Sequence, residues 1–118
     1  LVTSPTPPIA VAEAQPGWVV VQAVGPSLDY GTNGYSLSDA VGGRIHVVLA
    51  CTGTQPIVVS VDDSYPVGGG VHVQTFTAPC TPDGSETGQT FTVRTTGFIA
   101  SYTAPAGIWS ALTILAPH

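Results

Sequence analysis

Hydrophobic and polar residues alternate along most of this chain with a period close to two, and no segment shows a convincing helical period. In the run RIHVVLAC, for example, Ile45, Val47 and Leu49 fall on one face of an extended strand. Runs rich in β-branched and aromatic residues predict strands near 9–13, 18–24, 44–51, 56–61, 71–77, 90–96, 97–103 and 108–115.

Short strands separated by Gly, Pro, Asn and Asp predict an all-β fold, an antiparallel sandwich of eight or nine strands that is immunoglobulin-like or jelly-roll-like. A barrel is the alternative. The usual immunoglobulin form is disfavoured, because neither Trp18 nor Trp109 lies between the cysteines and Ala78 stands two residues before the second one.

The chain length allows one domain of ordinary size. Residues 1–14 begin with the proline-rich stretch TSPTPP, which predicts an extended N-terminal arm. Residues 15–118 are predicted to form the single sandwich domain.

The two cysteines, Cys51 and Cys80, each lie at or just beyond the end of a predicted strand. A pair of cysteines in such positions predicts one disulfide, and a lasting disulfide indicates an oxidising, extracellular or cell-surface location. The outer strands of a simple meander are roughly 9.5 Å apart, farther than a disulfide allows. Either the two strands face each other across two sheets, which we expect, or Cys80, just beyond its strand, leans back over the middle strand.

Charged residues make up only 8% of the chain, with a net charge of −5 and Arg44 and Arg94 as the only Lys or Arg residues. Two arginines cannot form the basic surface that nucleic acid or an anionic membrane surface requires, so we exclude both partners. Uncharged polar faces lose little on desolvation, which suits a surface that packs against a protein or a polymer.

The uncharged segment 95–117 contains an apolar window long enough to cross a bilayer. Pro105 and Gly107 interrupt this window at its middle. They predict two strands joined by a turn, and no membrane insertion is expected.

Aromatic and polar residues gather in the segment 25–36, which the sequence predicts to be a long loop with Asn33-Gly34 as its turn. Aromatic rings and nearby Asp or Asn side chains are the groups that bind sugars. The candidate ligand-binding residues, including one from the 62–70 loop, are Asp29, Tyr30, Asn33, Tyr35 and Tyr65. The competing interpretation is that the tyrosines fold down over the ends of the sandwich.

The N-terminal arm is a candidate for assembly. Ile9 and Val11 would share one face of a strand that begins after Pro8 and pairs either with its own sandwich or with that of a neighbour.

The sequence offers little for catalysis or for metal binding, and we expect no cofactor and no enzyme activity. His46 and His72 alternate with valines, which predicts solvent-facing or rim positions. Asp62 and Asp63 are neighbours and would point to opposite faces of a strand. These two acids, and Asp83 with Glu86, are expected to be solvated loop residues, with a loose calcium site as the alternative. No GxSxG motif is present.

Two functions remain. The first is an extracellular, non-catalytic structural or adhesive module that contacts proteins or assembles through its low-charge faces and its arm. The alternative is a carbohydrate-binding module that uses the 28–35 loop.

Overall fold

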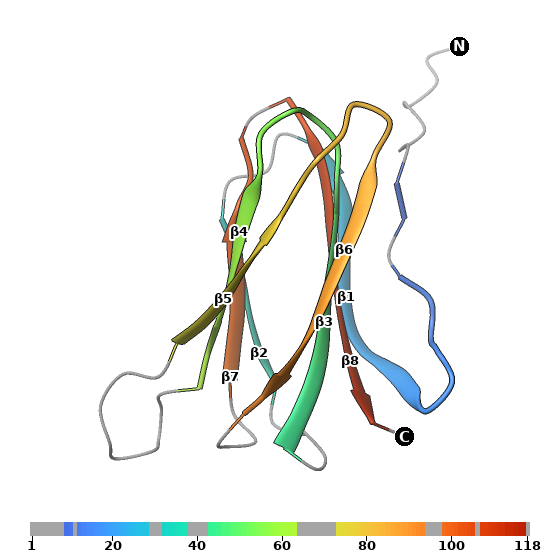
Figure 1. Ribbon diagram of the computed structural model, residues 1–118, viewed down its shortest axis with the longest axis vertical. Helices are drawn as coiled ribbons and strands as arrows, with labels where there is room; N and C mark the ends of the chain where they lie inside the picture. Colours follow the sequence, from blue (N-terminus) through green and yellow to red (C-terminus); the bar gives the residue numbers. More distant parts are fainter. Residues whose placement is uncertain are drawn as a thin grey trace.

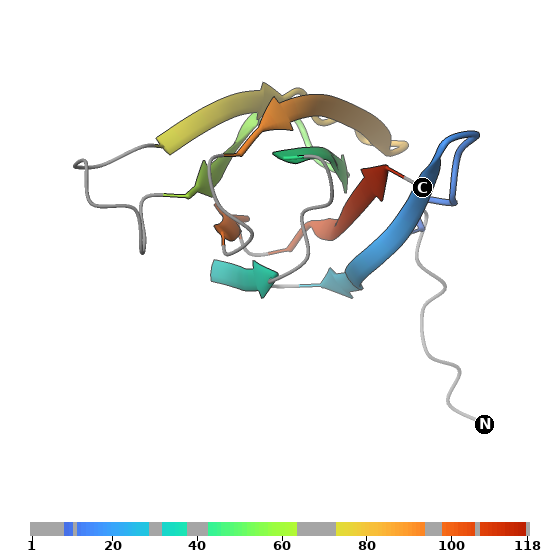
Figure 2. The ribbon, with the colours of Figure 1, turned by 90° about the horizontal axis from the view of Figure 1, so that it is seen from below.

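The structure is a computed structural model. It describes residues 9–10, 12–28, 32–37, 43–63, 73–93, 98–105 and 107–117, with the backbone alone for 26–28 and 32–37. In this part of the chain, eight strands form two four-stranded antiparallel sheets that pack face to face (Figures 1 and 2). The strands are β1 (Trp18–Leu28), β2 (Thr32–Leu37), β3 (Arg44–Cys51), β4 (Ile57–Asp62), β5 (Val73–Ala78), β6 (Ser85–Thr92), β7 (Phe98–Thr103) and β8 (Trp109–Pro117).

The strand order decides between the two predicted kinds of sandwich. Sheet A has the order β1-β8-β3-β6 and sheet B has the order β2-β7-β4-β5. The chain therefore pairs its first strand with its last, the second with the seventh, the third with the sixth and the fourth with the fifth. This nested pairing of eight strands is a jelly roll, and the immunoglobulin-like alternative is wrong in its topology.

The core lies between the two sheets and consists of the inward residues of the alternating runs. On β3 the inward residues Ile45, Val47 and Leu49 are fully buried, as the alternation predicted. Phe76 of β5 meets Phe91 of β6 across the core, with ring centroids 5.7 Å apart. This packing is the main force that holds the two sheets together.

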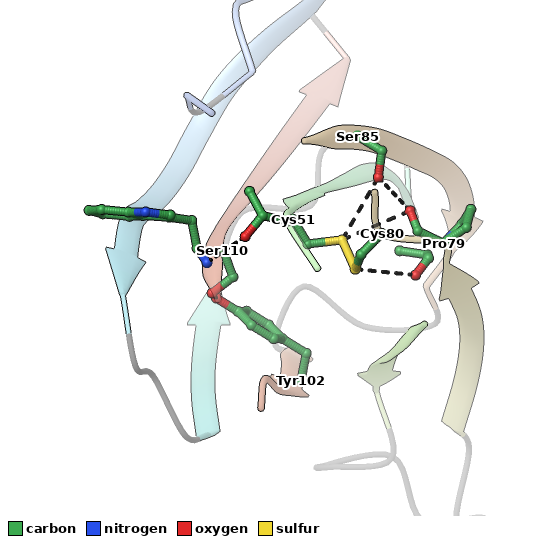
Figure 3. Close-up of a disulfide and its surroundings, with 9 residues drawn as sticks. Cys51, Pro79, Cys80, Ser85, Tyr102 and Ser110 are labelled. Atoms are coloured by element: carbon green, nitrogen blue, oxygen red, sulfur yellow. Dashed lines mark hydrogen bonds between the residues drawn. A yellow bond between two sulfur atoms is a disulfide. The ribbon is translucent and has the colours of Figure 1, made fainter. Parts of the chain in front are cut away.

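Figure 3 draws two of the specific bonds that cross between the sheets. Cys51 ends β3 of sheet A, and Cys80 follows β5 of sheet B; their disulfide joins Cα atoms 5.3 Å apart. The predicted bridge between sheets is thus confirmed. On the chain-entropy estimate it contributes about 3 to 4 kcal/mol. The Tyr102 hydroxyl of β7 also hydrogen-bonds the buried Ser110 hydroxyl of β8 at 2.9 Å.

Three predicted boundaries were wrong. The edge strand predicted at 9–13 does not form, because the described residues 9–10 and 12–13 join no ladder. The predicted 25–36 loop is mostly strand, since β1 continues to Leu28 and β2 covers 32–37. Pairing with β7 along the whole of β2 overrides the local turn preference of Asn33-Gly34. Strand β6 begins at Ser85, within the predicted acidic loop.

The apolar C-terminal segment forms strands β7 and β8, as predicted. The turn between them includes Gly107, which has a φ of 87°. Among the described residues, no helix is long and apolar enough to cross a membrane.

Candidate functional site

The outer face of sheet B, which points away from sheet A, exposes aliphatic side chains. Val58 of β4 is 53% exposed, Val73 of β5 is 45% exposed and Ile99 of β7 is 48% exposed. The side chains described on this face are those of Val58, Ser60, Asp62, Val73, Thr75, Thr77, Ile99, Ser101 and Thr103. Small hydroxyl side chains therefore surround a few exposed aliphatic ones.

The strand register arranges these residues in rows across the sheet. Ser60 of β4 lies opposite Thr75 of β5 on one side and Ser101 of β7 on the other. A groove of about 380 Å³ runs along this part of the face, between Pro56 and Pro105. Its lining includes Val58, Ser60 and Ser101, so the groove offers methyl groups and hydroxyls but no charge.

Charge is nearly absent from the outer face of sheet B. Asp62, at the end of β4, is the one ionisable group among the residues named for this face. The other described carboxylates lie elsewhere: Glu13 and Glu86 line a groove beside sheet A, Asp83 is in the turn before β6, and Asp63 is buried. The described carboxylates other than Asp62 thus lie away from the middle of this face.

The N-terminal arm covers part of the outer face of sheet A. Ala12 packs against Val48 of β3 and Leu115 of β8, with Trp18 beside them. The Ala12 N–H donates a 2.9 Å hydrogen bond to Oγ1 of Thr113, whose side chain is fully buried. A turn closed by the Trp18 N–H and the Gln15 carbonyl then leads into β1 (Figure 1).

One aromatic and cationic cluster lies on the same face of sheet A. The rings of Trp18 and His46 are 5.7 Å apart, and the Arg44 guanidinium lies 5.8 Å from the Trp18 ring. His46 Nδ1 lies 3.0 Å from the Thr90 hydroxyl. Burial lowers the pKa of His46, and the negative charge of Glu86 partly opposes this shift. His46 is half-buried, in keeping with the predicted rim position.

The predicted sugar-binding residues are not brought together as a loop surface by the described part of the structure. Asn33 and Tyr35 lie in β2, where they pair with Tyr102 and Ala100 of β7, both buried. Asp29, Tyr30 and Tyr65 lie outside the described residues, as does His72. Whether these residues form a site stays a prediction.

The predicted assembly residues are described only in part. Ile9 is half-buried, and Val11 lies outside the described residues. The neighbouring Ala12 is bound to the chain's own sheet A, through one side-chain hydroxyl and not through a β ladder. The described arm thus serves as a cover for its own domain.

Candidate metal ligands do not gather in the described residues, where no three His, Cys, Asp or Glu side chains lie close enough to hold an ion. Asp62 and Asp63 point to opposite faces, as predicted, but Asp63 is buried rather than solvated. Glu86 belongs to β6 and not to a loop.

Sequence reasoning did not single out the outer face of sheet B. The signal was present in the run IVVSV, where Val58 and Ser60 alternate with the core residues of β4. The alternation shows that these two residues share a face, but not that this face lacks a cover.

The comparisons with known proteins add little. No family model matches the chain, and no curated protein matches it either. A solved structure described as "CBM4 structure and function" aligns with 92% of this chain and 77% of its own, at 15% identity and a TM-score of 0.47.

Proposed function

We propose that this chain is an extracellular, non-catalytic structural module that assembles with further copies of itself through the outer face of sheet B. The observation that carries the proposal is the exposure of Val58, Val73 and Ile99 together on one face. Exposed aliphatic groups with a polar surround are typical of protein contact surfaces.

The charge distribution supports a second copy as the occupant. Two identical chains, each with a net charge of −5, repel one another wherever their carboxylates meet. The middle of this face, around Ser60 and Ser101, carries no ionisable side chain among its described residues. Asp62 lies between Val73 and Ile99 at one end of the face, so a two-fold contact centred on Ser60 and Ser101 keeps the two Asp62 carboxylates apart. The hydroxyl groups at the centre lose little on desolvation.

Two further observations support the rest of the proposal. The Cys51–Cys80 disulfide is typical of oxidising compartments. The groove on the outer face of sheet B is lined only by hydroxyl and apolar side chains, which suits a contact surface.

Sedimentation equilibrium of the chain and of Val58→Asp tests the proposal. We expect the substitution to raise the dissociation constant at least about tenfold, because it buries a carboxylate from each copy. Val21→Asp is the matched control, since Val21 is a similarly exposed valine at a bulge of β1 in sheet A.

Thr77→Asp tests the same face of sheet B on the edge strand β5, where a substitution disturbs folding less. If both sheet B variants associate as the unmodified chain does, or if the unmodified chain is a monomer, the proposal is wrong.

Carbohydrate binding by the 28–35 segment is the second candidate function. One observation favours it: Gly34 of this segment lies opposite Ser101, which lines the groove on sheet B. A glycan array with the unmodified chain and with a Tyr30→Ala, Tyr35→Ala double variant tests it. Binding that survives the double substitution would place any sugar site elsewhere.

A further inference from the structure

The outer edge of β6 ends sheet A, and its backbone groups can be assigned from two hydrogen bonds. The Val93 N–H donates to the Gly43 carbonyl at 2.7 Å, so the odd-numbered residues of this strand bond toward β3. The Thr92 carbonyl accepts instead from the Gln74 side chain of β5, at 2.7 Å.

The pairing of β3 with β6 runs without a register shift from Arg44–Thr92 to Cys51–Ser85. In an antiparallel pair, successive residues point their N–H and C=O groups alternately toward and away from the neighbour. The N–H and C=O groups of Glu86, Gly88 and Thr90 therefore point outward, along the open edge.

These outward groups are accessible. Glu86, Gly88 and Thr90 are all exposed, and no strand in the described part of the chain pairs with this edge. A glycine consists only of backbone, so the exposed surface of Gly88 is backbone surface. The His46 ring fills the space above Gly88, where a Cβ would lie 2.7 Å from Nε2, and leaves the edge itself open.

The opposite edge of the same sheet is built differently. The pairing of β1 with β8 has register shifts at Val20/Gln22 and Val24/Ser27, and Gly25, within the second shift, has a φ of 95°. Bulges and prolines such as Pro26 blunt an edge strand against further pairing, as do lysines. Strand β6, with the sequence SETGQTFT, has none of these features.

We infer that β6 is an interface through which two copies of this chain pair edge to edge, antiparallel about a two-fold axis, to form one continuous sheet. A register centred on Gly88 uses all three outward residues and places Glu86 opposite Thr90 of the second copy. The Glu86 carboxylates of the two chains then do not lie opposite each other, an arrangement that would be unfavourable between like charges. The contact is separate from the outer face of sheet B and does not rest on the proposed function.

Amide hydrogen exchange, followed by NMR at low and at high protein concentration, tests this inference on the unmodified chain. We expect the amides of Gly88 and Thr90 to exchange at least about tenfold more slowly at high concentration, where they bond to the second copy. The amides of Thr87 and Gln89 bond to β3 in the monomer and should be protected at both concentrations.

Gln89→Lys adds a charge at the exposed centre of the edge and should raise the dissociation constant at least about tenfold. Gln55→Lys, in the exposed bend before β4, makes the same change in net charge and should have no effect. Because Val58→Asp leaves this edge intact, it should not alter the exchange of Gly88 and Thr90.

Two results would overturn the inference. One is a monomer at concentrations up to about 1 mM, a range that covers weak protein contacts. The other is a dimer in which the Gly88 and Thr90 amides exchange as fast as in the monomer. The second result leaves the sheet B proposal standing, because a face contact protects no edge amide.

Discussion

The outer faces of the two sheets are formed by similar strands but differ in their exposure to solvent. Val48 lies on the outer side of the inner strand β3 of sheet A, and Val58 lies on the outer side of the inner strand β4 of sheet B. Val48 is 3% exposed, whereas Val58 is 53% exposed. The difference comes from the N-terminal arm, whose residue Ala12 packs against Val48. Burial on an outer face is thus set by what covers it and not by the strand itself.

Deletion of the N-terminal arm should cause the largest loss of stability. Deleting residues 1–14 uncovers Val48 and Leu115 and leaves the buried Thr113 hydroxyl without its Ala12 donor. We expect a loss of about 2 to 4 kcal/mol in the free energy of unfolding, measured by urea denaturation. An unchanged midpoint would mean that the arm adds nothing to the stability of sheet A.

A matched pair of substitutions sharpens the comparison at single residues. Val48→Thr buries a hydroxyl under the arm and should cost about 1 to 2 kcal/mol. Val58→Thr places the same hydroxyl in solvent and should change the stability by no more than about 0.5 kcal/mol. Equal losses at the two sites, measured by denaturation of both variants, would contradict the difference in burial.

The strands themselves could be predicted from the sequence because alternation is a local signal. The runs 44–51 and 56–61 formed β3 and β4 close to their predicted bounds. The two cysteines favoured a bridge between sheets because the outer strands of a simple meander lie too far apart for a direct disulfide. Local turn preference failed at Asn33-Gly34, where the partner strand β7 lies far along the chain.

The candidate surfaces depend on contacts that no local pattern records. The Ala12–Thr113 hydrogen bond joins residues 101 positions apart, and without it the covered face of sheet A cannot be recognised. The outward residues of β6 follow only from its register with β3, which the sequence alone does not supply. A polar residue such as Thr113 within an apolar run was the one local hint of a buried partner.

Thr113→Val tests the hydrogen bond apart from the rest of the cover. It removes the acceptor of the Ala12 N–H and keeps the shape of the side chain, so it should cost about 1 kcal/mol. Thr77→Val, on the exposed face of sheet B, is the matched control and should be nearly neutral. A neutral result at both sites would show that water replaces Thr113 as the partner of the arm.

The smallest expected effect is a pH dependence of stability that comes from His46 on the outer face of sheet A. The pKa of His46 lies below its ordinary value of 6.5, chiefly because burial beside Trp18 disfavours the charged ring. The negative charge of Glu86 opposes this shift, because it favours the protonated ring.

Because the unfolded chain binds the His46 proton more tightly, His46 should stabilise the fold fully above about pH 6.5. Its contribution should decrease as the pH falls from there through the lowered pKa of the folded state. The measurement is the difference in unfolding free energy between the unmodified chain and His46→Gln, from about pH 8 to about pH 5. This difference cancels the titration of His72 and His118, which both proteins share. Glu86→Gln should enlarge the decrease, since it removes the charge that opposes the shift. A difference that stays constant with pH would mean that His46 titrates alike in the folded and unfolded chains, and that its contact with Trp18 does not exclude water.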